Sequence, residues 1–197
     1  LEAALKVKNR EWLLWLLSYA GGPEALPGLL DMLDTTPESF DAALLAVQSI
    51  GASGMSANNF DLIPALVNRM QTREGRERIA LINTLGAIGD PKAAPALLEI
   101  MDQDAAARDA AIAALGRIGD PQTAGALWAA HRDTGSSAAA DAYLKVVEHM
   151  KPKDAASAYR TLLEVSDDPK VTCAALCGLG KTAASQKTVR ALCDRLD

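Results

Sequence analysis

Apolar residues recur along the chain at spacings of three and four, and short polar turns separate one such segment from the next. This spacing places apolar side chains on one side of an amphipathic helix. In the clearest segment, Ala111, Leu115 and Ile118 share one face. Asp104 is placed to cap the start of this helix, and Gly119 to end it in the left-handed conformation. The pattern therefore predicts an all-α fold.

The same segment occurs twice. The sequence LGAIGDP at Leu85–Pro91 returns as LGRIGDP at Leu115–Pro121. Asp120 is placed to cap the next helix, and Pro121 stands at its first position, where a missing N–H costs nothing. A link this short makes neighbouring helices antiparallel. Such self-similarity predicts a superhelical α-solenoid of about six stacked helical hairpins.

Each hairpin is expected to pair an outer helix with an inner one. In the outer helix 91–101, Pro95 is expected to lie inside the helix and bend it. In the inner helix ending at Gly119, Gly116 is expected to let a neighbouring helix approach closely. Two other glycines, Gly51 and Gly180, are expected to end their inner helices.

The remaining helices follow in the same order. The outer helices are predicted at 23–33, 61–70, 91–101, 121–131, 155–165 and 185–196, and the inner helices at 9–20, 37–50, 76–88, 104–119, 136–150 and 169–179. Residues 52–59 form a longer loop than the Gly-Asp-Pro link. Residues 1–197 are interpreted as one repeat domain, a fragment of a longer protein cut within a repeat at both ends.

The run Ala-Leu-Gly-x-Ile-Gly-Asp-Pro that ends at Pro121 carries a family resemblance, together with Arg108 ahead of Gly119 and Arg78 ahead of Gly89. It resembles the HEAT-repeat family, in particular the short bacterial HEAT-like repeats of the phycobilin-lyase type. The resemblance implies stacked helical hairpins in a right-handed superhelix. It leaves the ligand open, because one fold serves many functions.

Composition narrows the function. Hydrophobic residues make up 49% of the chain and aromatic residues 4%, so the core is expected to be mainly alanine and leucine. The net charge of −5 and the lack of a basic run argue against nucleic-acid binding. No apolar run reaches the length of a membrane span. Cys173, Cys177 and Cys193 are expected to be buried, which favours a reducing, cytoplasmic setting without fixing the compartment.

Catalytic and metal-binding patterns are weak. His131 and His149 are the two histidines, and neither is followed by the glutamate that the iron-binding HEAT-like hydroxylases would require. The pairs Arg78–Asp90 and Arg108–Asp120 recur once in each repeat, so we interpret them as ties between repeats, through charge-assisted hydrogen bonds to helix ends. The chain is therefore predicted to be no enzyme and to carry no metal and no cofactor.

Aromatic residues mark the clearest departure from the repeat. Trp15 and Tyr19 take the positions held by Ala113 and Arg117 in the regular copy, away from the core stripe. Trp128, in contrast, is expected in the core. The positions in register with Trp15 and Tyr19 define a predicted protein-binding face on the inner, concave side, comprising Glu11, Trp15, Tyr19, Asp41, Leu45, Asn83, Ala87, Asp109, Arg117, Asp141, Lys145 and His149.

Two functions fit these observations. The first is a non-catalytic scaffold or binding module that presents this face to a protein or peptide, with acidic residues favouring a basic partner. The alternative is an accessory segment of a larger, lyase-type enzyme whose chemistry lies elsewhere. A preceding repeat that covers Trp12 and Trp15 would also explain the aromatic residues.

Overall fold

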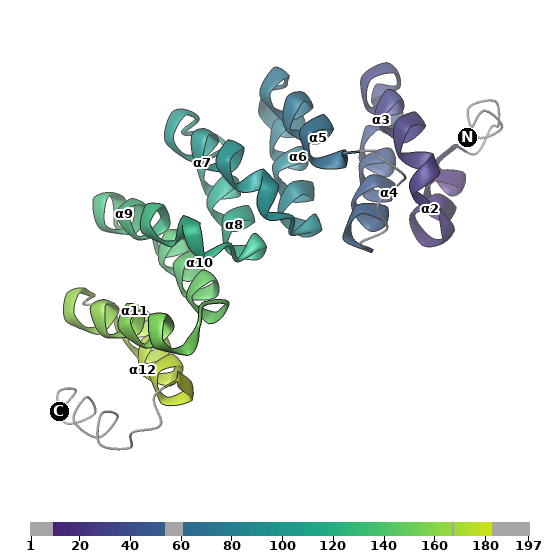
Figure 1. The fold of residues 1–197 in the computed structure, drawn as a ribbon. Helices are drawn as coiled ribbons and strands as arrows, with labels where there is room; N and C mark the ends of the chain where they lie inside the picture. Colours follow the sequence, from purple (N-terminus) through teal and green to yellow (C-terminus); the bar gives the residue numbers. More distant parts are fainter. Residues whose placement is uncertain (1–9, 54–60, 167, 183–197) are drawn as a thin grey trace. The chain divides into compact units, whose positions relative to one another are not determined.

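The computed structural model describes residues 10–53, 61–166 and 168–182, and these residues form helices joined by turns, without strands. The chain divides into two compact units, residues 1–114 and 115–197, and the boundary falls within α8. Figure 1 shows the helices in chain order. The prediction of an all-α, solenoid-type fold is confirmed, and its predicted last helix, 185–196, lies outside the described residues.

The N-terminal unit begins with α2 (Arg10–Ala20) and continues with three helical pairs. Its further elements are η1 (Pro23–Ala25), α3 (Leu26–Thr35), η2 (Pro37–Ser39), α4 (Phe40–Ala52), α5 (Leu62–Thr72), α6 (Gly75–Ile88), η3 (Pro91–Ala93), α7 (Ala94–Gln103) and the start of α8 (Arg108–Ile118). Helix α4 packs against α2, α3 and α6, and α5 packs against α6. The inner helices α2, α4 and α6 thus contact one another in chain order, while the outer helices α3 and α5 cover their own partners.

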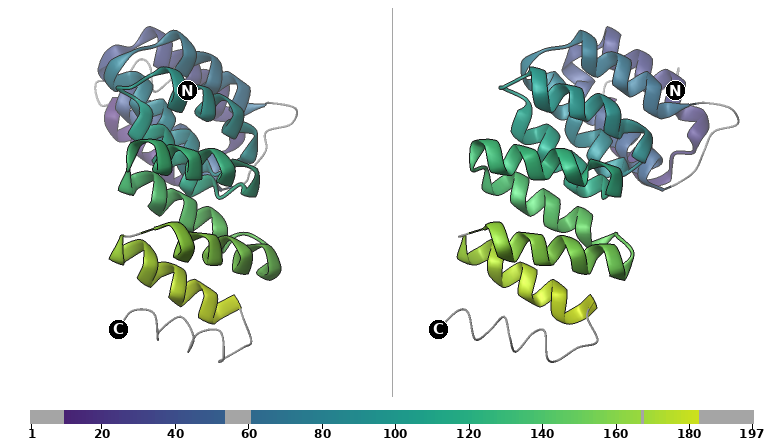
Figure 2. Two further views of the ribbon diagram at one scale, coloured as in Figure 1. Left: turned by 90° about the vertical axis from the view of Figure 1, so that its left-hand side faces the viewer. Right: turned by 60° about the vertical axis from the view of Figure 1, so that its left-hand side comes forward.

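The C-terminal unit repeats this arrangement. After the end of α8 it contains η4 (Pro121–Thr123), α9 (Ala124–Thr134), α10 (Ser137–Glu148), α11 (Pro152–Val165) and α12 (Pro169–Thr182). Helix α9 packs against α10, α11 against α12, and α10 contacts both members of the second pair. Figure 2 shows these four helices in green and yellow.

The Gly-Asp-Pro links form as the sequence predicts. Gly89 and Gly119 adopt left-handed conformations, with φ of 77° and 69°. Asp90 accepts a hydrogen bond from the backbone N–H of Lys92, and Asp120 accepts one from that of Gln122. Asp104 likewise accepts from the N–H groups of Ala106 and Ala107, just ahead of α8. The short links between hairpins therefore follow directly from local sequence.

The prediction of a proline bend inside the outer helices is wrong. Pro91 begins a 3-10 turn, and Pro95 then stands in the first turn of α7. Pro27 occupies the same place in α3, after the turn that Pro23 begins. The first N–H groups of a helix have no partner within it, so proline removes no hydrogen bond there. These prolines mark helix starts.

Two glycines do not end their helices where the sequence suggested. Gly51 lies inside α4, which continues to Ala52, and Gly180 lies inside α12, which continues to Thr182. Neither glycine has a positive φ. Helix α4 therefore ends one residue after Gly51, and α12 continues two residues beyond Gly180.

The core consists of alanine and branched aliphatic side chains, as composition predicted. In α10, however, the buried face is not the one that Leu144, Val147 and Met150 form at a spacing of three. Val147 is buried, but Leu144 and Met150 are only half-buried, and Tyr143 is buried instead. Tyr143 contacts the ring of Trp128 at a centroid distance of 5.4 Å, so aromatic contact sets the rotation of this helix.

Replacing Gly119 by valine should destabilise the protein by more than the equivalent change at Gly89. Both positions have a positive φ, which a β-branched residue resists at a cost of about 1–3 kcal/mol. A side chain at Gly119 would also collide with the ring of His149, whereas one at Gly89 would meet nothing within 4 Å. Urea unfolding followed by circular dichroism measures both. Adding His149→Ala to both variants should remove the difference in stability between them. If Gly119→Val and Gly89→Val alone lose equal stability, the His149 ring moves aside at no cost.

Candidate protein-binding face

An exposed aromatic surface lies on α2. One side of the helix packs against α4 and buries Leu14 completely. On its other sides Trp12 is 59% exposed, Trp15 55% and Tyr19 85%. The rings of Trp15 and Tyr19 stack at a centroid distance of 5.9 Å with an interplanar angle of 26°. Exposed aromatic side chains at this density on one helix make this surface a candidate for protein interaction.

Helix α4 extends this surface. Leu45, one repeat after Trp15 in the sequence, is 49% exposed, and Ser49 donates a hydrogen bond to the backbone oxygen of Ser18. Asp41, one turn before Leu45, forms an ion pair with Arg76 of α6 at 2.5 Å. We call the exposed set Trp12, Trp15, Leu16, Tyr19 and Leu45 the α2–α4 patch. It combines apolar area with a polar, charged margin.

Of the other predicted face residues, Ala87 is half-buried and seven are exposed, but these seven belong to two units. Asp41, Asn83 and Asp109 lie in the N-terminal unit, and Arg117, Asp141, Lys145 and His149 lie in the C-terminal unit. Glu11 has a side chain outside the described set. The structure brings Trp15, Tyr19 and Leu45 together on packed helices. A single face through all twelve residues stays a prediction.

Leu16 is the member of the patch that sequence reasoning missed. It is 40% exposed and lies on the side of α2 between Trp12 and Tyr19. The register of α2 indicates this exposure, because a helix that buries only one stripe leaves residues at other angles exposed. Since α2 is apolar on all sides, however, its sequence does not show which side faces α4.

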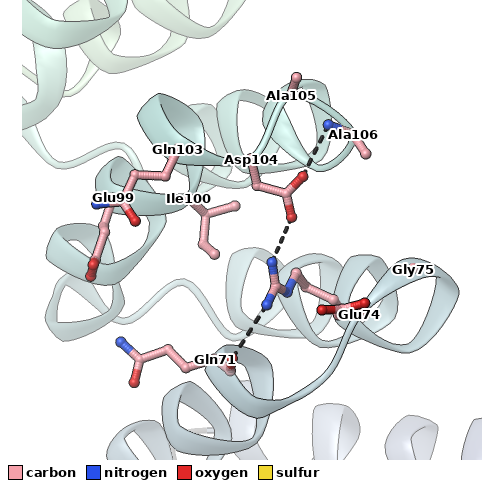
Figure 3. A pocket seen from close by; sticks show the side chains of 10 residues that line it. Gln71, Glu74, Gly75, Glu99, Ile100, Gln103, Asp104, Ala105 and Ala106 are labelled. Carbon is pink, nitrogen blue, oxygen red and sulfur yellow. Dashed lines mark hydrogen bonds and ion pairs between the residues drawn. The ribbon is translucent and has the colours of Figure 1, made fainter.

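A second concave feature lies at the turn between α5 and α6 and the end of α7 (Figure 3). It is a cleft of about 730 Å³ lined by Gln71, Glu74, Gly75, Arg78, Glu99, Ile100, Gln103, Asp104, Ala105 and Ala106. Its charged centre is the ion pair between Arg78 and Asp104, with an N···O distance of 2.6 Å. The hydrogen bond from Arg78 lowers the pKa of Asp104; burial opposes this, and two backbone N–H groups add to the lowering.

This geometry corrects the predicted arginine pairs. Arg78 binds Asp104, not Asp90, and it also donates to the backbone oxygens of Met70, Gln71 and Arg73. Arg108 donates to the oxygen of Met101 at 2.9 Å. The prediction of bonds to helix ends is confirmed, since both guanidinium groups bind backbone oxygens near the end of the outer helix of their own hairpin. The ion pair of Arg78 with Asp104 joins two hairpins, whereas the bond from Arg108 to Met101 stays within one. Asp90 and Asp120 serve as caps instead.

Two further predictions about burial need correction. Cys173 and Cys177 are exposed, one turn apart on α12, and Cys193 lies outside the described residues. Trp128 is half-buried, not fully in the core, and its ring also contacts His131.

Within the described ranges, no group of three or more potential metal ligands occurs. The groups with shifted pKa values lie in ion pairs or in the core. Burial raises the pKa of Tyr143 and of Tyr159 in the core of the C-terminal unit. Asp34 and Asp104 have lowered pKa values because arginines bind them. None of these four residues lies on α2, which carries most of the α2–α4 patch.

The fold and the exposed inner-helix surface define a helical-repeat scaffold. The family model for HEAT repeats matches residues 38–108 and, in a second overlapping match, 63–144. Together the matches cover more than half of the chain, so the protein belongs to the HEAT-repeat family. The narrower likeness to the phycobilin-lyase type stays a prediction. No curated protein matches the sequence.

Family membership supports a repeat scaffold or protein-interaction module as the function class. The search for membrane spans adds one finding: of the helices in the described part of the chain, none combines the length and apolarity needed to cross a bilayer.

Proposed function

We propose that the protein is a non-catalytic binding module whose α2–α4 patch contacts a protein or peptide partner. The observation that carries the proposal is the stacked, exposed pair Trp15 and Tyr19. Large, rigid aromatic side chains lose little conformational entropy on binding and dominate interface energies. The adjacent Leu45 widens the apolar area onto a second helix.

The charge distribution favours a basic partner. Residues 1–114 contain nine Lys and Arg against fifteen Asp and Glu, whereas residues 115–197 contain eleven against ten, so the formal charges are −6 and +1. The unit that carries the α2–α4 patch therefore holds the chain's negative charge. Such a field attracts a basic segment during encounter, while the aromatic anchors supply the affinity. The partner is a basic protein segment with an apolar anchor.

The proposal of a non-catalytic role rests on the surroundings of the titratable groups. Asp104 in the cleft has a low pKa because Arg78 and backbone N–H groups bind it, and all of these contacts tie helix ends together. A general acid or base needs a pKa tuned toward neutral pH. A group of this kind in the cleft would favour the alternative, an accessory segment of a larger, lyase-type enzyme.

Selection from a random peptide library against the purified chain tests the proposal. We expect peptides rich in Lys and Arg with an aliphatic or aromatic anchor. For one such peptide, the double variant Trp15→Ala/Tyr19→Ala should weaken binding by about tenfold or more, because removing an aromatic hot spot costs at least about 1–2 kcal/mol. Isothermal titration calorimetry measures the affinity.

A matched control is Val165→Ala, which removes an exposed apolar side chain from α11 in the other unit. Binding to this variant should equal binding to the unmodified chain. Peptides that bind the double variant as tightly as the unmodified chain would place the contact elsewhere and refute the assignment of the α2–α4 patch.

A further inference from the structure

Each inner helix of the repeat has a side that faces the preceding inner helix, and two contacts identify this side. In α4, Ser49 donates a hydrogen bond to the backbone oxygen of Ser18 in α2. In α10, Ala142 lies against α8, because a Cβ atom added to Gly116 would lie 2.8 Å from the Cα atom of Ala142. The two contacts come from different turns of an inner helix, so together they define a stripe along it.

On α2 the same stripe consists of Trp12, Leu16 and Tyr19. In the register that defines the predicted binding face, Ser49 takes the place of Tyr19, and Ala142 takes the place of Trp12. Leu16 lies one turn after Trp12, and spacings of four and three place all three side chains on one side of the helix. We call Trp12, Leu16 and Tyr19 the α2 stacking stripe.

The stripe is exposed on α2 but covered on later inner helices. Leu16 is 40% exposed, and Trp12 and Tyr19 are more exposed still. At the place of Leu16, later inner helices bury the side chains of Ala46 in α4, Thr84 in α6 and Val146 in α10. The α2 stacking stripe therefore continues, at an exposed helix, the interface by which the inner helices of this protein pack on one another.

The size of its side chains tells which kind of helix this stripe can accept. The later inner helices have alanine in the place of Trp12, at Ala42, Ala80, Ala110 and Ala142. Ala142 already leaves no room for a Cβ atom at Gly116. A helix as close as α8 is to α10 would therefore collide with Trp12, even with glycine opposite the ring. Helix spacing follows the side chains at the contact, so the fitting helix lies farther away than in a regular repeat and presents a small residue to Trp12.

Charge limits the occupant further. The N-terminal unit, which carries the stripe, has a formal charge of −6. A symmetric pair of chains joined through their stripes would bring two such units together, and their charges would repel. A helix with lysine and arginine on its outward sides is attracted instead. Charge therefore favours a basic helix over a second copy of the chain.

We propose that the α2 stacking stripe binds a basic, amphipathic helix of a partner protein, which packs along α2 as an added inner helix. Its apolar side covers Trp12 and Leu16, and its Lys and Arg side chains point away from the contact. The proposal rests on the proposed function, because it names the conformation of that partner. It also places the partner along α2 rather than across α2 and α4.

A library of basic helical peptides tests the conformation on the whole chain. The peptides have about 18 residues, long enough to form a helix on binding, and the positions of one apolar stripe are randomised while Lys or Gln occupies the others. We expect selected peptides to carry Gly or Ala at a central stripe position and aliphatic residues around it. Proline placed mid-peptide, off the stripe, should weaken binding by about a hundredfold in calorimetric titrations, because it disrupts the helix.

Two results would overturn the helical conformation. One is that no helical peptide binds while peptides from the linear random library do. The other is that the peptide with proline binds as tightly as its parent. Either result leaves the proposed function standing, because that function requires a basic partner but not a helical one.

Leu16→Lys tests the position of the helix. The substitution puts a cation into an apolar contact with a basic helix, so binding of the selected peptide should fall by about tenfold or more. Leu45→Lys is the matched control, because it makes the same change at another exposed leucine, on α4. Its loss should stay below about twofold, as expected outside the centre of a contact. If Leu16→Lys loses helix by circular dichroism, Trp12→Ala replaces it with the same expectation.

An equal or larger loss for Leu45→Lys would place the peptide across α2 and α4 and overturn the stacked position. Sedimentation velocity of the chain alone tests the second copy: we expect a monomer, and a dimer that Leu16→Lys dissociates would assign the stripe to self-association and overturn the partner helix. Failure of Trp15→Ala/Tyr19→Ala to weaken any selected peptide refutes the proposed function itself, whatever the conformation of the peptide.

Discussion

Gly116→Val is expected to destabilise the C-terminal unit by about 3 kcal/mol, the upper end of the range for overpacking a close contact. A Cβ atom at position 116 would lie 2.8 Å from the Cα atom and 2.9 Å from the Cβ atom of Ala142 in α10. Backbone cannot rotate away as a long side chain can, so the two helices would have to separate. The better helix propensity of valine, under about 1 kcal/mol relative to glycine, is too small to compensate.

Urea unfolding followed by circular dichroism measures this effect, and Gly125→Ala is its control. Gly125 also lies in a helix of the C-terminal unit, in α9, but a Cβ atom there would meet nothing within 4 Å. The control should be neutral or stabilising by up to about 1 kcal/mol, the propensity difference between the two residues. Equal stability of both variants would mean that α8 and α10 do not approach as closely as the structure places them.

Arg78→Ala should have the second largest effect on stability. Loss of the hydrogen bonds to backbone oxygens alone should lower the free energy of unfolding by about 2–3 kcal/mol, at about 1 kcal/mol each. Its guanidinium group bonds to Met70, Gln71 and Arg73 and closes the turn between α5 and α6 onto α7 through Asp104. Only 17% of the Arg78 side chain is exposed, so water replaces these donors poorly.

The same variant changes the response to acid. Because Arg78 lowers the pKa of Asp104 in the folded protein, the carboxylate contributes stability above the ordinary aspartate pKa and loses it as the pH falls through the lower, folded value. In Arg78→Ala this contribution should shrink, so the decline of stability at acid pH becomes shallower. Urea midpoints measured from neutral to acid pH follow both effects.

Arg76→Ala provides the comparison. Arg76 also pairs with an aspartate, Asp41, but its side chain is 84% exposed. Exposed ion pairs contribute little to stability, so the free energy of unfolding should fall by no more than about 1 kcal/mol. If Arg76 and Arg78 proved equally important, ion pairing would outweigh the bonds that Arg78 makes to the helix end, and the expected order of the two variants would be wrong.

The local sequence was sufficient wherever one residue's own backbone preference decides the structure. Gly119, Asp120 and Pro121 end one helix and begin the next, and each does so through a conformation or a bond confined to a few neighbouring residues. The same reasoning failed at Pro95 and Gly51. Proline and glycine each occur at more than one position in a helix, so the residue type alone does not fix the position.

The candidate site could likewise be predicted only in part from the sequence. The exposure of Trp15 and Tyr19 could be predicted, because their register leaves the core stripe of a regular repeat. The partner of Arg78 could not, since Asp90 and Asp104 both lie near enough in sequence. Only the packing of α7 beside the α5–α6 turn brings Asp104 to 2.6 Å. The ion pairs of Asp34 with Arg69 and Arg73 had no sequence signal, because their residues come from separate hairpins.

The sequence by itself determined that this chain is a helical-repeat protein, where most of its helices lie and which residues cap them. These features depend on contacts between residues a few positions apart, and they recur from one repeat to the next. Tertiary structure alone decided which charged groups pair across helices and which side of α2 faces α4. Those outcomes depend on the distance between helices that are distant in sequence, which is set by the packing of the whole unit.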